Sequence, residues 1–204
     1  MQELLLATKN PGKFEEIEEA LKGLPFRFVF LRDMVWSGAV DDSDFVEDGH
    51  TFFENAEKKA RYYGEKTGLV TLGEDSGILV DALEGELGVQ TRRWGAGEKV
   101  SDKKWIEYFL ERMKDVPENE RGAKFVCCAC VFVRGKVSLF EGETCGRITG
   151  KLMATIKEGV PLSSCFIPDG LDKVYAALSP GEKNRVSHRG KAMAKVREML
   201  KQVL

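Results

Sequence analysis

The sequence predicts an α/β fold. Short apolar runs rich in β-branched residues alternate along the chain with segments whose apolar residues recur at helical spacing. Helix-capping residues stand at several of the boundaries between the two kinds of segment. The 204 residues, 43% hydrophobic and 31% charged, suit a single globular domain, residues 1–204, with a sizeable core.

The N-terminal half predicts strands and helices in turn. Asn10 is a good N-cap and Pro11 suits the first helical position, so a helix begins there and ends at Gly23. Thr51 and Glu54 form a capping box for a second helix, which runs to about residue 66. The predicted strands are residues 3–8 and 25–31. Residues 32–49, acidic and without a clear period, predict a loop.

The stretch from residue 69 to residue 80 begins as a buried strand and is then interrupted by Glu74, Asp75, Ser76 and Gly77. Two acids at the end of a strand cost solvation unless a cation or hydrogen-bond donors face them. Loops at the carboxyl ends of strands are also where α/β sheets bind ligands. The alternative is an ordinary tight turn, for which Asp-Ser-Gly is suitable chemistry. A further strand then begins at Ile78.

The C-terminal half predicts a helix capped by Ser101, a hairpin about Arg134-Gly135, and a final helix capped by Ser187. Residues 124–133 and 136–140 form the hairpin, and the weak alternation of residues 143–149 predicts another strand. Residues 166–170 predict a short strand and turn, and Ser179 begins a short helix. The predicted buried residues of the final helix are Ala192, Val196, Met199, Leu200 and Val203.

Five cysteines, three of them at Cys127, Cys128 and Cys130, raise the question of a metal cluster. Neighbouring residues of a strand point to opposite faces, and both histidines lie far away in the sequence. We therefore expect these cysteines to serve as small buried apolar residues in a reducing compartment.

Two groups of cations lie near predicted helix N-termini. Lys9 and Lys13 flank the turn before the first long helix, where free backbone N–H groups favour an anion; the alternative is an ordinary turn with solvated lysines. Lys183, His188 and Arg189 gather where the dipole of the final helix opposes them, so they are a second candidate phosphate site.

Lys59 lies near the start of its predicted helix, where a cation does not favour the dipole, and shares a face with Asn55. Asp75 and one acid from residues 41–48 are plausible ligands for Mg²⁺, which takes one or two carboxylates together with phosphate oxygens. The residues alone thus indicate a metal-dependent phosphate-ester or nucleotide enzyme.

Four motifs resemble, in order, those of the inosine/xanthosine triphosphate pyrophosphatases, the Ham1/RdgB family. They are residues 8–13 (TKNPGK), 52–60 (FFENAEKKA), 74–77 (EDSG) and 182–190 (EKNRVSHRG). The resemblance runs nearly end to end. It implies an α/β fold of two lobes around a long mixed sheet, with a central substrate cleft, and a homodimer.

The resemblance also implies roles for individual residues. Asp75 is the catalytic base and, with Glu47, a ligand of Mg²⁺. Residues matching substrate contacts are Thr8, Asn10, Lys13, Lys59, Ser76, Lys183, His188 and Arg189. The implied reaction is attack of water on the α-phosphorus of ITP, dITP or XTP, which gives a nucleoside monophosphate and pyrophosphate.

One segment departs from the family pattern. Val160 stands where the family has the aromatic residue that stacks on the base, and Ser163 stands where it has an aspartate. Residues 176–178 also lack the family's usual acid. We therefore expect an altered base pocket, with a weakened preference for 6-oxo purines. The alternative to an active enzyme is a nucleotide-binding or structural homologue with little turnover.

The net charge of −2 provides no overall basic field for nucleic acid. No apolar run approaches membrane-spanning length, and the first residues lead directly into a strand instead of a signal peptide. We therefore expect a cytoplasmic protein that binds neither nucleic acid nor membrane.

Overall fold

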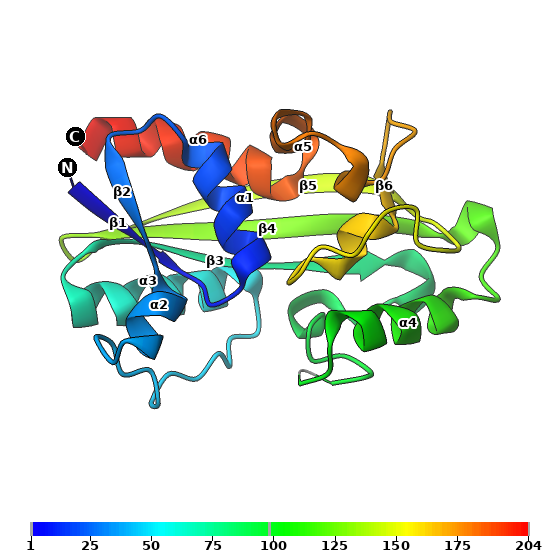
Figure 1. The fold of residues 1–204 in the computed structure, drawn as a ribbon, viewed down its shortest axis with the longest axis horizontal. Helices are drawn as coiled ribbons and strands as arrows, with labels where there is room; N and C mark the ends of the chain where they lie inside the picture. The colour runs from blue at the N-terminus through cyan, green and yellow to red at the C-terminus, as the bar shows by residue number, and fades with distance from the viewer. Residues whose placement is uncertain (1, 98, 204) are drawn as a thin grey trace.

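The computed structural model describes residues 2–97 and 99–203, without the side chain of residue 203. A six-stranded mixed sheet runs through it in the order β2-β1-β3-β4-β5-β6 (Figure 1). The strands are β1 (Gln2–Ala7), β2 (Phe26–Phe30), β3 (Val70–Val80), β4 (Gly122–Val133), β5 (Lys136–Ile148) and β6 (Phe166–Pro168). Strand β1 is parallel to both β2 and β3, and the remaining pairs are antiparallel.

Helices cover both faces of this sheet. Helices α1 and α6 lie on one face, and α3 and α4 lie on the other, at opposite ends of the long strands (Figure 1). The α-helices are α1 (Pro11–Leu21), α2 (Leu31–Trp36), α3 (Phe52–Thr67), α4 (Asp102–Met113), α5 (Pro180–Val186) and α6 (His188–Val203). Short 3₁₀ helices are η1 (Asp81–Leu83), η2 (Gly88–Gln90), η3 (Glu118–Glu120), η4 (Pro161–Ser164) and η5 (Tyr175–Ala177). The predicted two-lobed architecture around a long mixed sheet is confirmed.

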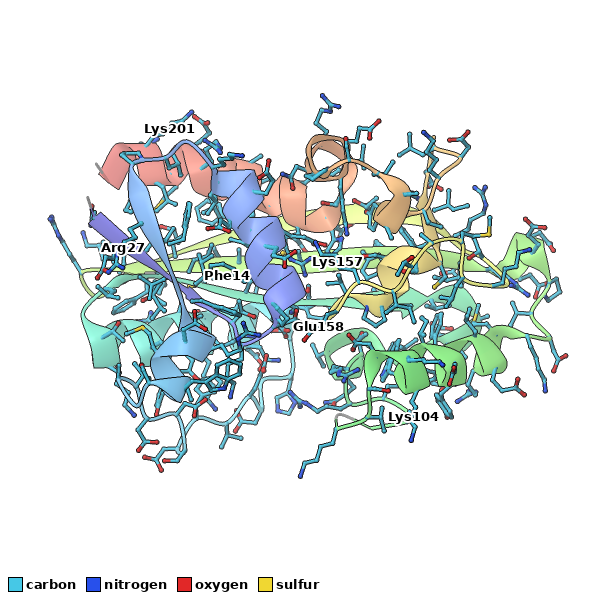
Figure 2. All side chains as sticks on the ribbon, viewed as in Figure 1. Phe14, Arg27, Lys104, Lys157, Glu158 and Lys201 are labelled. Carbon is cyan, nitrogen blue, oxygen red and sulfur yellow. The ribbon has the colours of Figure 1, made fainter. Side chains whose placement is uncertain are left out.

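Apolar clusters define the two lobes. One groups β1 with α1 and α6 and includes Leu4, Ile17 and Val196. Phe14, labelled in Figure 2, packs against this cluster. Its ring stacks on that of Phe30, with the ring centroids 4.2 Å apart. A separate cluster in the other lobe is built around Trp105 on α4. Because β3 and β4 contribute to both clusters, the same strands hold the two lobes together.

The predicted caps are confirmed. The Asn10 side chain accepts from the backbone N–H of Lys13, and Thr51 and Glu54 make a reciprocal capping box. Ser187 Oγ accepts from Gly190 N–H at the start of α6. Each cap satisfies N–H groups that have no partner inside the helix. Helix starts were therefore well marked in the sequence.

Two predictions of irregular structure are wrong. Residues 32–36, expected as loop, belong to α2, which begins at Leu31 and whose N-cap Phe30 gives no side-chain hydrogen bond. Residues 74–77, expected as a strand end or turn, continue β3 without a break, with Glu74 opposite Ala129 and Gly77 opposite Val126 on β4. Tertiary pairing thus overrides local sequence preference at both places.

The predicted separate strand at residues 143–149 is also wrong, because β5 runs unbroken from Lys136 to Ile148. The cysteines of β4 are buried as expected: Cys127 packs on the α1/α6 side, and Cys128 and Cys130 pack on the α3 side. None of the helices within the described ranges combines the length and apolar character needed to span a bilayer.

Candidate functional site

The site begins where β1 ends. Strand β1 pairs with β3 only as far as Ala7 opposite Gly73, so the next part of β3 presents a free edge. Two backbone N–H groups on that edge are satisfied by side chains: Ser76 N–H donates to Asp75 and Ile78 N–H to Thr91. An unpaired strand edge exposes donors and acceptors that need partners. The carboxyl end of a parallel strand thus opens a ligand-sized space beside β3.

The turn from β1 into α1 closes one side of that space. Thr8 Oγ1 accepts from Asn10 N–H at 3.1 Å, and Asn10 Oδ1 accepts from Lys13 N–H at 3.0 Å. Lys13 Nζ lies 2.9 Å from Glu74 Oε2. Burial alone would lower the pKa of Lys13, but the carboxylates of Glu74 and Asp75 outweigh it and raise that pKa. The turn therefore presents a helix N-terminus and a charged ammonium, a suitable arrangement for phosphate.

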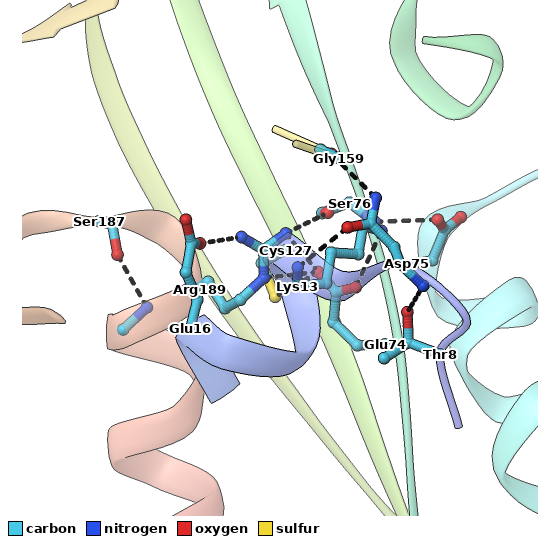
Figure 3. Close-up of polar contacts among 12 residues, drawn as sticks. Thr8, Lys13, Glu16, Glu74, Asp75, Ser76, Cys127, Gly159, Ser187 and Arg189 are labelled. Atoms are coloured by element: carbon cyan, nitrogen blue, oxygen red, sulfur yellow. Dashed lines mark hydrogen bonds and ion pairs between the residues drawn. The ribbon is translucent and has the colours of Figure 1, made fainter. Parts of the chain in front are cut away.

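Successive residues of β3 point to opposite faces of the sheet and serve different partners (Figure 3). Asp75 faces α3, where Asn55 Nδ2 donates to its Oδ2 at 3.0 Å and Lys59 Nζ lies 3.8 Å from its Oδ1. Burial raises the pKa of Asp75, and this effect outweighs the nearby Lys59 and Lys13 ammonium groups. A buried carboxylate with a raised pKa is a plausible proton acceptor.

Glu47 lies on the other side of Lys59, with its Oε1 accepting from Nζ at 2.6 Å. Burial raises the pKa of Glu47, but the Lys59 ammonium outweighs it, so the pKa falls below its ordinary value. One cationic group thus lies between the carboxylates of Glu47 and Asp75. These hard oxygen ligands fit a divalent cation, since they already share a positive charge.

No group of three or more His, Cys, Asp or Glu side chains in the described part of the chain is arranged to hold a metal ion. A cation bound by Glu47 and Asp75 would therefore take its remaining ligands from water or from the bound substrate. Mg²⁺ binds in this way, through one or two carboxylates and substrate phosphates.

On the α1/α6 face, a buried ionic network joins four elements. Arg189 donates from Nε and Nη2 to Glu74 Oε1 at 3.2 and 3.1 Å and also pairs with Glu16. Lys183 Nζ donates to the other oxygen of Glu16 at 2.6 Å. Burial raises the pKa of Glu16, but Arg189 and Lys183 outweigh it and bring that pKa to about 2. Protein carboxylates thus already neutralise the cations of the predicted second phosphate site, which weakens that interpretation.

The remaining predicted residues form the apolar end of the space. The His188 ring stacks on Phe125 at 4.6 Å, and its Nδ1 has no hydrogen-bond partner among the described residues. Burial and the Arg189 charge hold the pKa of His188 well below 6.5. Ser163, in η4, accepts from Lys183 through its Oγ at 3.0 Å. Val160 is half-buried and directly precedes η4. A neutral, partly aromatic wall of this kind suits a flat heterocycle.

All these features border one cavity of about 700 Å³. The predicted site residues that line it are Thr8, Asn10, Lys13, Glu47, Lys59, Asp75, Ser76, Val160, Ser163, Lys183, His188 and Arg189. The structure therefore brings every predicted site residue to a single cavity, charged at one end and apolar at the other.

The sequence interpretation missed several residues of this site. Glu16 escaped notice because its partners lie 167 and 173 residues away. Arg92, Arg93 and Trp105 also line the cavity, from the loop after η2 and from α4. One feature of the sequence could have indicated that Glu16 is buried: it precedes Ile17, on the apolar face of an amphipathic helix.

A model of the Ham1 family matches residues 4–199. The chain belongs to the Ham1 family. Two Ham1-like relatives are named dITP/XTP pyrophosphatase: one from Oceanobacillus iheyensis, 35% identical with 98% of each chain covered, and one from Geobacter sulfurreducens, 39% identical with 98% of this chain and 97% of the relative covered. The solved Ham1 protein of Coxiella burnetii has a TM-score of 0.79 and 30% identity, with 99% of this chain and 100% of that chain covered.

Proposed function

We propose that this protein is a Mg²⁺-dependent nucleoside triphosphate pyrophosphatase that converts ITP, dITP and XTP to the monophosphate and pyrophosphate. The observation that carries the proposal is that one cavity gathers three kinds of group. The phosphate-binding turn at Asn10 and Lys13, the carboxylates of Asp75 and Glu47, and the aromatic wall at His188 all line it. A nucleotide bound with its base at the apolar end would place its phosphates beside the carboxylates.

The residues divide the chemistry between them. The α1 N-terminus, Lys13 and Lys59 bind and orient the phosphate chain, which is the main contribution in reactions that proceed by positioning. The carboxylate of Asp75 accepts a proton from a water molecule while the oxygen of that water forms a bond to the α-phosphorus. The bond from that phosphorus to the bridging oxygen breaks, and pyrophosphate leaves. Mg²⁺ held by Glu47 and Asp75 would lower the pKa of water and neutralise charge on the leaving group.

Two groups at the apolar end support a choice of base. Val160 provides no aromatic ring for stacking, an interaction worth about 1–3 kcal/mol per base in proteins that bind nucleic acids. His188 and Arg189 still offer N–H groups, which can recognise a carbonyl oxygen. We therefore expect a preference for 6-oxo purines that is weaker than the family's usual discrimination.

Pyrophosphate release from ITP, XTP, GTP, ATP and UTP with Mg²⁺ tests the proposal. We expect the highest kcat/KM for ITP and XTP. A clear preference for ATP or UTP would show that the pocket is built for another base. Tight binding of ITP without pyrophosphate release would favour a nucleotide-binding protein with little turnover.

The homodimer and the cytoplasmic location that the resemblance implies are also proposals. Analytical ultracentrifugation at micromolar concentration tests the first, and fractionation of the source cells tests the second.

A further inference from the structure

The backbone of Gly159 joins two helices from opposite lobes. Its N–H donates to Asp102 Oδ2 at 2.6 Å, and its carbonyl accepts from Asn10 Nδ2 at 2.8 Å. Asp102 is the first residue of α4, and Asn10 is the N-cap of α1. A residue in a loop therefore connects the start of α1 to the start of α4.

The loop lies too close to α1 for any larger residue. Gly159 has φ of +77°, and a Cβ there would overlap the side-chain amide of Asn10. A Cβ at Gly12 on α1 would in turn overlap the backbone of Glu158. Lys157 and Glu158 lie beside α1 in Figure 2, and Lys157 Nζ is 2.9 Å from Glu15. This close approach requires glycine on both sides.

Asp102 is anchored on its other side as well. Its Oδ1 lies 3.2 Å from Arg92 Nη1, and Arg92 Nη2 donates to the carbonyl of Val100 at 2.6 Å. The cavity is lined by three of these residues, Arg92, Gly159 and Asn10. Asp102 is not among the lining residues and contacts the cavity wall through Arg92 and Gly159. We call the connected set Arg92, Asp102, Gly159 and Asn10 the Gly159 clasp.

We propose that Asp102 is a positioning residue that, through Gly159, sets the spacing between the two ends of the cavity. The inference rests on the proposed function, since it assumes a ligand that reaches both ends. Gly159 leads through Val160 into η4, whose Ser163 accepts from Lys183 at the apolar end, while Asn10 caps the phosphate-binding turn. A ligand in contact with both ends depends on the spacing that Asp102 sets. A ligand in contact with the phosphate end alone does not, because the Lys13 N–H holds Asn10 in its turn without Asp102.

The test compares Asp102→Ala and Asp102→Asn with Glu107→Ala, an exposed residue of the same helix. Two ligands separate the ends of the cavity: a non-hydrolysable α,β-imido analogue of ITP and inorganic tripolyphosphate, each titrated with Mg²⁺ by calorimetry. We expect Asp102→Ala to weaken binding of the analogue about tenfold or more, the loss typical of one hydrogen bond to a charged group. Binding of tripolyphosphate and the behaviour of Glu107→Ala should match the wild type.

Asp102→Asn keeps an oxygen that can accept from Gly159 N–H, so it should restore most of the lost affinity. Hydrogen exchange of peptides that cover Gly159 gives a readout independent of nucleotide: exchange should be faster in Asp102→Ala than in the wild type. Equal losses for both ligands, or unchanged exchange at Gly159, would overturn the role of Asp102. Failure of the wild type to bind the analogue would instead overturn the proposed function. The exchange measurement would still show whether Asp102 holds the backbone of Gly159.

Discussion

The side-chain amide of Asn55 donates to Asp75 Oδ2 at 3.0 Å and also holds the loop that carries Glu47. Its Oδ1 accepts from Gly49 N–H at 2.8 Å, two residues after Glu47. A single buried residue of α3 thus fixes both carboxylates assigned to the cation relative to each other. Partners of this kind orient ligands and are costly to remove.

Replacing Asn55 should therefore impair turnover more than folding. Asn55→Asp has nearly the same shape but loses the N–H donor and places a negative charge against Asp75. We expect kcat with ITP to fall by about 10–100-fold, in line with other residues that support metal ligands. Glu65→Gln, exposed near the end of the same helix, is the control. Unchanged kcat in a folded Asn55→Asp protein would contradict this role.

Asp75→Asn tests the catalytic base. The amide keeps the shape of the side chain but cannot accept the proton of water, so turnover should fall by about a hundredfold or more. Circular dichroism and thermal unfolding should stay close to the wild type, because Asn can still accept from Asn55. A folded variant that releases pyrophosphate at the wild-type rate would show that Asp75 is not the base.

Lys13→Ala tests the phosphate-binding turn. Loss of a charged partner typically costs about 1.5–3 kcal/mol, and the effect should be larger for ITP than for IMP, because only ITP carries the β- and γ-phosphates. Lys59→Ala should behave in the same direction. Lys104→Ala on the exposed face of α4 is the matched control (Figure 2). Equal losses of affinity for ITP and IMP would contradict the assignment.

The free energy of unfolding should fall in two pH ranges as the solution is acidified. His188 has a pKa well below 6.5, so below pH 6.5 the unfolded chain takes up a proton that the folded chain does not. Glu16 has a folded pKa of about 2 against an ordinary value of 4.5, so its contribution is complete above pH 4.5 and is lost as pH falls toward 2. Urea unfolding at several pH values between 7 and 3 measures both effects.

Glu16→Gln isolates the second pH range. The substitution leaves Arg189 and Lys183 with one fewer buried carboxylate, and breaking a buried pair costs about 3–5 kcal/mol. We expect that loss at pH 7 and a smaller decrease in stability below pH 4.5 than in the wild type. Glu18→Gln, exposed on the same helix, should change neither quantity. A Glu16→Gln protein as stable as the wild type at pH 7 would show that the network contributes little.

Sequence patterns predicted well what depends on near neighbours. Asn10 and Thr51 mark helix starts because an N-cap acts within three residues, and the alternation of buried cysteines follows from one strand. The Ham1 resemblance located most of the cavity residues because they fall within four contiguous motifs; Glu47, Val160 and Ser163 lie outside these motifs. Helix α2 was missed because it is short and lacks a side-chain cap.

What depends on distant partners could not be predicted. Glu74 and Asp75 look like a break in a strand until β4 is placed beside them, since its ladder holds these acids in extended conformation. The partners of Asp102 are equally distant, since Gly159 lies 57 residues away along the chain. The spacing of residues along the chain does not predict contacts between residues so far apart in the sequence.

The pairing of Arg189 with Glu16 and Glu74 has a consequence for biosynthesis. Two acids from the first half of the chain remain without their shared guanidinium until α6 leaves the ribosome. An unpaired charge is expensive to bury, so the interior of the active site can close only after α6 has been synthesised. A nascent chain that stalls before α6 therefore keeps both carboxylates in water and cannot assemble the buried network.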